Sequence, residues 1–300
     1  MGKVVVFGSI NRDLVARVAR TPHAGETVAS LSYAEYPGGK GANQAIAARR
    51  MGARVALVGA VGADGHGVAM RDFLSGEGVD LGSLRVLADH ATGLAIIVVD
   101  AAGENTIIVV PGANSRVSGE MLVVSALEAG DILLAQCEVP VAEIEVAFRK
   151  AKRAGAMTLL NPAPMQPLPP ALLALCDVIV MNEGELAALC GRNTPFDASS
   201  IEPAMQDFRQ SLAPSCILIT TLGAAGALAL GPKGTIRIPG YAASSLDTTG
   251  AGDCFVGVLA AALCEKVSLN IALSRANRAA SLSVTRKGAA ISMPFRSELA

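Results

Sequence analysis

This 300-residue chain has few aromatic residues and almost no net charge. It has no tryptophan, 3% aromatic residues and a formal net charge of −1. Proteins that bind nucleic acids combine basic surfaces with aromatic side chains on which bases stack, so we expect no nucleic acid partner. The three histidines, His23, His66 and His90, lack the spacing of a zinc site.

Long apolar runs and paired cysteines are also missing. The longest uncharged apolar stretch that suits a helix, Cys254–Cys264, has about eleven residues, too few to span a bilayer. The N-terminal segment reads as a strand and lacks the apolar region and cleavage site of a signal peptide. The six cysteines form no Cys-x-x-Cys pair. We therefore expect a cytoplasmic protein without membrane segments or a disulfide framework.

The hydrophobic residues, 51% of the chain, alternate between short β-branched runs and longer Ala-rich helical patterns. Strands are expected at 4–7, 55–58, 131–135, 157–160, 178–181 and 217–220. Helices are expected at 42–51, 66–77, 141–154, 183–190 and 203–212. Buried strands with helices between them predict a mostly parallel sheet covered on both faces, a three-layer α/β fold. No linker or repeat is visible, so we expect one domain over residues 1–300.

Two segments interrupt this rhythm. The runs 14–18 with 27–36, and 94–100 with 104–110, read as antiparallel ribbons, the second turning at 101–103. Such ribbons do not fit inside a parallel sheet. We expect them to form a small β lid, built from about 12–37 and 92–112, over the ends of the strands, where α/β enzymes bind substrates.

The most informative segment is Asp247–Asp253, a small-residue turn that leads into the apolar run 254–264. The first N–H groups of a helix attract anions, and glycines at 250 and 252 would let a ligand approach the backbone. A carboxylate beside bound phosphate would repel it, but Asp253 makes sense as the group that takes a proton from a hydroxyl attacking that phosphate.

A purely structural helix start explains the same turn, because aspartate is favoured there for stability alone. Two other phosphate-binding motifs are ruled out by single positions. A dinucleotide fingerprint needs glycine where Phe255 stands, and a P-loop needs serine or threonine where Gly41 stands.

Two loops near the N-terminus are candidates for a sugar site. Asn11 and Asp13 follow the first strand, and an aspartate that accepts two hydrogen bonds suits a vicinal diol, although a plain capped turn also fits. The glycine-rich segment 37–43 opens a helix that carries Asn43. Its three glycines are better explained by close approach of a small ligand than by chain reversal alone.

Two further loops follow predicted strands. Asn182 with Glu185 forms a capping-box pattern, which explains both residues structurally. The alternative is that they orient the waters of magnesium, which keeps several waters and few carboxylates. The segment 219–226 is a strand that ends in a small-residue loop and is uninformative alone.

Taken together and in this order, these segments resemble the PfkB family of carbohydrate kinases over almost the whole chain, from Gly8 to about Pro294. The segments 38–62 and 247–259 correspond to the two family signatures. The pairing of 8–13 with 38–44, together with 161–164 and 284–289, is most similar to the ribokinase group. The resemblance implies transfer of the ATP γ-phosphoryl group to a sugar hydroxymethyl, which for that group is the 5-hydroxyl of D-ribose, and a lid that often pairs across a homodimer.

The resemblance also implies site residues. The general base would be Asp253, and the anion hole would be formed by Gly250, Ala251 and Gly252. The sugar would be held by Asn11, Asp13, Gly39, Lys40, Asn43, Glu138 and Asp253. The nucleotide would be bound by Asn182, Thr221, Gly223, Gly226, Gly252 and Asn277. Glu185 would organise magnesium through water, and a potassium ion would be held by Asp247, Thr249, Ser283, Arg286, Gly288 and Ser292.

Three alternatives stay open at this point. Another kinase of the family could act on deoxyribose, fructose, a keto-deoxy acid or a nucleoside such as pseudouridine, although the lid segments hold few aromatics beyond Tyr33 and Tyr36. A catalytically silent sugar-binding member would be expected to have lost Asp253 or the glycines beside it. A dinucleotide-dependent dehydrogenase would need the fingerprint that the chain lacks.

Overall fold

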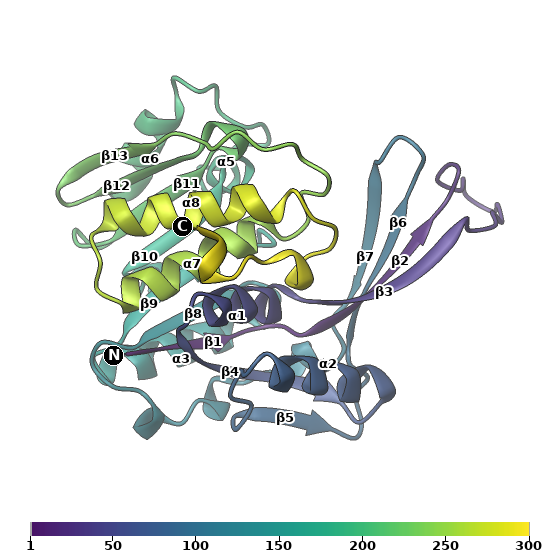
Figure 1. Ribbon diagram of the computed structural model, residues 1–300. Coiled ribbons are helices and arrows are strands. Elements are labelled where there is room, and N and C mark those ends of the chain that lie inside the picture. Colours follow the sequence, from purple (N-terminus) through teal and green to yellow (C-terminus); the bar gives the residue numbers. More distant parts are fainter. Residues whose placement is uncertain (1, 300) are drawn as a thin grey trace.

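Nine strands form the central sheet of the computed structural model, which describes residues 2–299 (Figure 1). Their order is β13-β12-β11-β10-β9-β8-β1-β4-β5, parallel from β11 to β5, with β12 and β13 added antiparallel at one edge. The strands are β1 (Lys3–Phe7), β4 (Arg54–Gly62), β5 (Leu84–Leu87), β8 (Ile132–Gln136), β9 (Met157–Asn161), β10 (Val178–Asn182), β11 (Ile217–Thr221), β12 (Ala227–Gly231) and β13 (Gly234–Ile238).

Helices cover both faces of this sheet, as predicted. One apolar core joins the sheet to α1 (Lys40–Arg50), α2 (Gly65–Gly76), α7 (Ala251–Cys264) and α8 (Leu269–Ser283). The other joins it to α3 (Val141–Arg153), α4 (Pro170–Leu173), α5 (Glu183–Leu189) and α6 (Ile201–Arg209). Along β1, Val4 and Val6 enter the first core, whereas Val5 and Phe7 enter the second. A strand buried on both faces reads as a continuous apolar run for this reason.

The predicted β lid is confirmed as a separate four-stranded sheet that projects from the body (Figure 1). Its order is β3-β2-β6-β7, with bounds β2 (Asn11–Arg17), β3 (Ser32–Gly38), β6 (Gly93–Val99) and β7 (Asn105–Val110). Each expected ribbon is antiparallel, and the two are joined by parallel pairing of β2 with β6. That joining was not predicted, because no local pattern specifies which edges of two distant ribbons meet.

The elements predicted from apolar periodicity are present, with ends shifted by a few residues. The strands β5, β12 and β13 were missed. β5 has no fully buried residue and β13 has one, so neither shows the continuous apolar run of a central strand. Short 3-10 turns occupy Gly112–Arg116, Gly119–Met121, Val124–Ala126, Gly223–Ala225, Ala290–Ser292 and Arg296–Leu299.

Helices α1 and α7 cross in close contact, and this crossing positions the candidate site. Gly257 lies against α1, where a Cβ atom would come 2.4 Å from the Gln44 carbonyl oxygen and 2.6 Å from Cβ of Ala47. Glycine is therefore required at the crossing, since any side chain would push the helices apart. The first turns of both helices consequently lie side by side.

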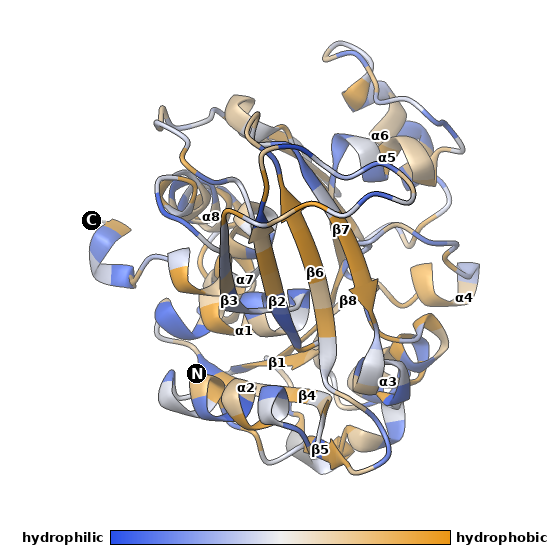
Figure 2. Ribbon diagram, turned by 90° about the vertical axis from the view of Figure 1, so that its right-hand side faces the viewer, coloured by the Kyte–Doolittle hydropathy of each residue, from blue (hydrophilic) through white to orange (hydrophobic). Residues whose placement is uncertain are grey.

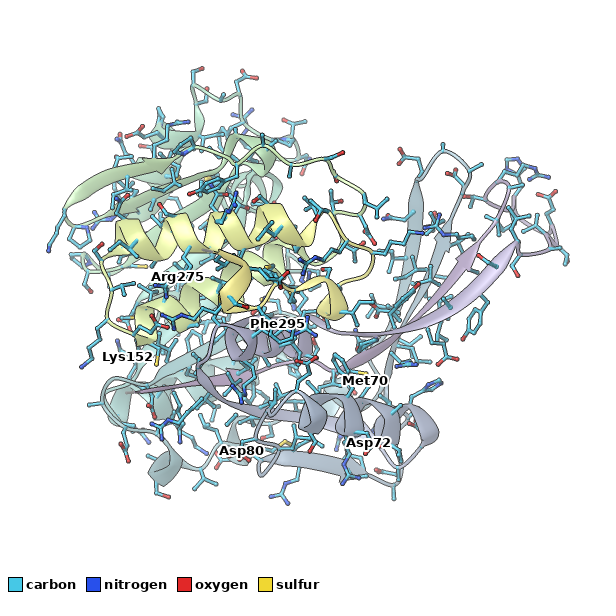
Figure 3. All side chains as sticks on the ribbon, viewed as in Figure 1. Met70, Asp72, Asp80, Lys152, Arg275 and Phe295 are labelled. Carbon is cyan, nitrogen blue, oxygen red and sulfur yellow. The ribbon has the colours of Figure 1, made fainter. Side chains whose placement is uncertain are left out.

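The C-terminal segment fastens the other end of α1. The Arg50 guanidinium donates to the Met293 carbonyl at 2.6 Å and lies 4.7 Å from the ring centre of Phe295, labelled in Figure 3. On α2, Met70 is buried and Asp72 is exposed, as expected of an amphipathic helix (Figure 3).

Two expectations from composition can be compared with the structure. All six cysteines are free. Within residues 2–299, no helix combines the length and apolar character that crossing a membrane requires.

Candidate active site

The predicted site residues gather at one edge of the sheet, where the parallel strands end. Ser9 and Asn11 follow β1, Glu138 follows β8, and Asn182 and Thr221 end β10 and β11. In α/β sheets this edge is where ligands bind, next to the point where the order of strands reverses. That point lies between β1 and β8, because the chain continues from β1 outward to β4 and later returns on the other side.

Asn11 and Asp13 lie on β2, at the base of the lid. Both are buried, and Asp13 is 9% exposed. The buried side chain of Asn114, which follows the second lid ribbon, donates to Oδ1 of Asn11 at 2.7 Å and also bonds both backbone groups of Ile10. Asn11 therefore presents its remaining amide N–H groups, as donors, to a ligand. Sequence reasoning missed Asn114, which no local pattern distinguishes.

The three glycines of segment 38–41 pack against the protein itself. A Cβ at Gly38 would lie 2.2 Å from the Asp13 carboxylate, one at Gly39 would lie 2.6 Å from the Asn11 nitrogen, and one at Gly41 would lie 2.6 Å from the backbone of Gly8. That a ligand approaches these glycines stays a prediction. The structure gives a further reason for them, because they let the start of α1 touch the loop after β1.

Asp253, in the first turn of α7, is buried and receives two amide hydrogen bonds from α1. Asn43 Nδ2 donates to its Oδ2 and Gln44 Nε2 donates to its Oδ1, both at 2.9 Å. The Asn43 Oδ1 atom is buried without a partner. Since its amide nitrogen is used by Asp253, this oxygen is left as an unsatisfied buried acceptor.

Acidic groups outnumber basic ones around Asp253. Mainly the charge of Asp253, with Glu138, Glu185 and Asp13 adding to it, raises the pKa of Lys40 against the opposing effect of burial. Burial, together with the charges of Glu138 and Asp253, raises the pKa of Asp13 to about 7. Burial also raises the pKa of Glu185. An excess of carboxylates around one ammonium favours cationic ligands or hydroxyl donors.

Two cavities adjoin at Gly252, the residue before Asp253. The smaller, of about 200 Å³, is lined by Lys40, Asn161, Asn182, Glu185 and Asp253 among others. The larger, of about 450 Å³, is lined by five of the six predicted nucleotide residues: Thr221, Gly223, Gly226, Gly252 and Asn277. Thr221 and Gly252 line both cavities, so a ligand in one reaches the other.

The larger cavity also contains residues that sequence reasoning missed. Tyr241 lines it and lies 5.3 Å from the guanidinium carbon of Arg278. Phe255, Ser281 and Val284 add apolar and small side chains. A flat apolar ligand fits such a lining. The only local signal was a lone tyrosine after Gly240, which is too weak to predict a site.

The start of α7 faces both cavities at Gly252. Space beside its Cα is open, and as the second residue of the helix its N–H has no partner within the helix. Ala251 N–H donates to the Thr248 carbonyl at 3.2 Å. Gly250 has φ 76°, and a Cβ there would lie 2.9 Å from Ala289. Gly250 is thus required by the turn and its packing, whereas Gly252 leaves room for a ligand.

The capping box at Asn182 and Glu185 is present. Glu185 N–H donates to Asn182 Oδ1 at 2.8 Å, and Asn182 N–H donates to Glu185 Oε2 at 2.9 Å. Both residues still line the smaller cavity. One Glu185 oxygen, in a cavity with room for water, fits a magnesium ion that is held largely through its waters.

The residues predicted for potassium lie on two segments that the structure brings together. Asp247 accepts hydrogen bonds from the Thr249 and Gly288 N–H groups at 2.9 Å each. Burial opposes ionisation, but these hydrogen bonds lower the pKa of Asp247. Ser283 and Ser292 direct their hydroxyls to backbone carbonyls, and Arg286 pairs with Glu298. The structure thus joins the turn at Asp247 to the 283–292 segment through the Gly288 N–H.

The raised pKa of Asp13 predicts a pH-dependent cost to stability. Between about pH 4 and 7 the folded state holds a proton that the unfolded chain releases, so ionising Asp13 destabilises the fold as pH rises through that window. D13N removes this cost. The free energy of unfolding of D13N, relative to that of the native protein, should therefore rise between pH 5 and pH 8, by at most about 4 kcal/mol.

Urea unfolding at several pH values measures this difference. D72N, which removes an exposed carboxylate on α2, is the matched control. A D13N advantage that is the same at pH 5 and pH 8 would contradict the assignment.

The comparisons with known proteins agree with this geometry. Residues 1–296 match the pfkB family carbohydrate kinase model. Ribokinase from Haemophilus influenzae is 39% identical over 299 residues, which covers 98% of this chain and 96% of that protein. The crystal structure of ribokinase from Thermotoga maritima matches with a TM-score of 0.89 at 32% identity, over 100% of this chain and 98% of that one. The structure of Arabidopsis thaliana ribokinase, complexed with ribose and ATP, matches with a TM-score of 0.90 at 32% identity and the same coverage. The chain belongs to the pfkB family of carbohydrate kinases and is a phosphotransferase that acts on a sugar hydroxyl.

Proposed function

We propose that this kinase transfers the γ-phosphoryl group of ATP to the 5-hydroxyl of D-ribose. The observation that carries the proposal is the position of Asp253, which lines the smaller cavity next to Gly252, a residue that lines both cavities, and which is held by two amide donors. The larger cavity, with Tyr241 and Asn277, suits an adenine nucleotide. The ribokinase relatives, and the one complexed with ribose and ATP, support ribose as the acceptor.

The polar groups near the lid base suit a small polyhydroxy acceptor. Asn43 Oδ1 and the Asp13 carboxylate accept hydrogen bonds from hydroxyls, and Asn11 donates one. Glu138 accepts from the Lys40 N–H at 3.0 Å and from the Ser9 hydroxyl at 2.5 Å, which fixes the loop that carries Asn11. A site of this kind discriminates by hydroxyl pattern, since each unpaired buried group is costly.

In the reaction, the attacking hydroxyl oxygen bonds to the γ-phosphorus, the bond from that phosphorus to the β–γ bridging oxygen breaks and ADP leaves, and Asp253 accepts the hydroxyl proton. A carboxylate is a weak base for an alcohol, which suffices when the transition state is loose and the proton moves late. The Gly252 N–H and the Lys40 ammonium stabilise charge on the transferred group, aided by the dipole of α7. Positioning by α1 and α7 then supplies much of the rate enhancement.

Two cations complete the proposed site. Magnesium, organised through water by Glu185, would neutralise phosphate charge beside the excess of carboxylates. Potassium, beside Asp247 and the backbone of the 283–292 segment, would fix the turn that leads into α7. Ser283 and Arg286 contribute through their backbone carbonyls, because their side chains bond elsewhere.

We also propose a homodimer formed through the lid. Strand β7 is an edge strand exposed along its whole length, and Ile107 and Ile108, on opposite faces, are 50% and 59% exposed. The apolar character of β6 and β7 is visible in Figure 2. Such strands usually have a partner. Sedimentation at monomer mass at micromolar concentration would refute this proposal.

A cytoplasmic location completes the proposal. It is supported by the six free cysteines and by the dependence on ATP. Recovery of the protein outside the cytoplasm on cell fractionation would contradict it.

A coupled ADP-release assay tests the acceptor. Ribose, deoxyribose, fructose, adenosine and pseudouridine are compared at equal concentration, in potassium and in tetramethylammonium. We expect the highest kcat/KM for ribose and a clear rate increase with potassium. A higher value for another acceptor would reassign the substrate, and equal rates in the two salts would remove the potassium site.

Replacing Asp253 tests the base. D253N and D253A should lower kcat by roughly 10²–10⁴-fold, because proton removal is lost, and should leave nucleotide affinity nearly unchanged. Turnover comes from ADP release and affinity from titration calorimetry with an ATP analogue. E202Q, on the surface of α6, serves as the control. Near-native turnover of D253N would exclude the base role.

A further inference from the structure

A chain of buried amides reaches from strands β8, β9 and β10 to the proposed base. Gln136 Nε2 donates to Gln44 Oε1 at 2.7 Å, and Gln44 Nε2 donates both to Asn161 Oδ1, at 3.0 Å, and to Asp253 Oδ1, at 2.9 Å. Asn161 Nδ2 donates to the Val180 carbonyl at 2.9 Å. Gln44 and Gln136 are completely buried, and Asn161 is 7% exposed.

The groups at the two ends of this hydrogen-bonded series determine which way each side-chain amide is oriented. A backbone carbonyl only accepts, so Asn161 must turn its nitrogen to Val180 and its oxygen to Gln44. Asp253, when ionised, also only accepts. The Gln44 side chain therefore has one allowed orientation, with its nitrogen between two oxygen acceptors and its oxygen toward Gln136. Rotating it would face oxygen against oxygen at both contacts.

We propose that Gln44 is a positioning residue for the phosphoryl transfer, holding the Asp253 carboxylate in one rotamer with a free lone pair toward the acceptor hydroxyl. The proposal deepens the proposed function and rests on it. Asn43 holds the other carboxylate oxygen, but its Oδ1 is buried without a protein partner, and the resemblance assigns this residue to the sugar as well. Gln44 bonds only protein groups, so its effect on catalysis passes through Asp253.

Two substitutions at Gln44 separate positioning from simple core damage. Q44M keeps the volume but removes the donor, and we expect kcat to fall about 10–100-fold with the KM for ATP unchanged. In Q44E a carboxyl oxygen replaces the amide nitrogen that bonds Asp253 Oδ1 and Asn161 Oδ1. It should favour protonation at the base and move the acidic limb of the kcat profile to higher pH by about one unit or more.

Other charged groups face Asp253 and stay in place in these variants. They are Lys40 on α1, Asp13 on β2 and Glu185 on α5, with the buried thiol of Cys254 next to it in sequence. A shift of the acidic limb that appears in Q44E but not in Q44M is therefore assigned to the new carboxyl group.

T158V is the matched control for lost buried polarity. Thr158 is fully buried at the opposite end of β9 from Asn161, and its hydroxyl bonds the Leu175 carbonyl at 2.5 Å. The T158V substitution should lower the melting temperature and leave kcat and the pH profile of kcat unchanged. Native kcat in Q44M, or an unmoved acidic limb in Q44E, would overturn the positioning role while the kinase function stands.

A second measurement keeps the two proposals separable. The ¹³C resonance of the Asp253 carboxyl, assigned by its loss in D253N, is followed against pH in the free protein. In Q44E its titration should move to higher pH than in the native protein. If the native protein fails to phosphorylate ribose, the proposed function is wrong. The titration still tests the role of Gln44, and an unmoved titration curve in Q44E would exclude that role.

Discussion

The close crossing of α1 and α7 is the constraint on which the rest of the site depends. Gly257 lets the two helices touch, so that Asn43 and Gln44 on one helix reach Asp253 on the other. Because those three side chains lie near the starts of their helices, the same contact places the start of α7, with its free N–H groups, beside the start of α1. In the proposed function, this gives the Asp253 carboxylate a purpose beside a bound phosphate.

The charges of the site follow from this arrangement. Burying Asp13, Glu138, Glu185 and Asp253 around Lys40 is unfavourable for the free protein, as the raised pKa of Asp13 shows. In the proposed complex, a sugar that donates its hydroxyls to these groups and a divalent cation that accompanies the nucleotide would relieve that cost. The free site thus contains polar groups that are not fully satisfied, including the unpartnered Asn43 Oδ1, and satisfying them would favour ligand binding.

Much of the fold could be predicted from the sequence, because strands buried on two faces and amphipathic helices leave strong local patterns. The lid was predictable as two ribbons, since each is a local antiparallel hairpin. Its parallel seam between β2 and β6 was not, and neither were the exposed strands β5 and β13. These depend on tertiary contacts that no short window of sequence contains.

The candidate site was predictable where residues follow strand ends or open helices, as Asn11, Asn182 and Asp253 do. Gln44, Gln136 and Asn114 were missed, because a buried amide becomes informative only when its partners are known. The glycines of 38–41 were predicted to admit a ligand, and the structure adds a reason that no local pattern contains: they accommodate the chain's own loop.

The central claim is that the α1–α7 contact orients Asp253 for catalysis. The most direct test is the turnover of G257A, measured well below its melting temperature, beside G65A, whose added Cβ meets no atom within 4 Å. The account predicts that G257A loses at least about tenfold in kcat, because the helices must separate, and that G65A keeps native turnover. Native turnover in folded G257A would contradict it.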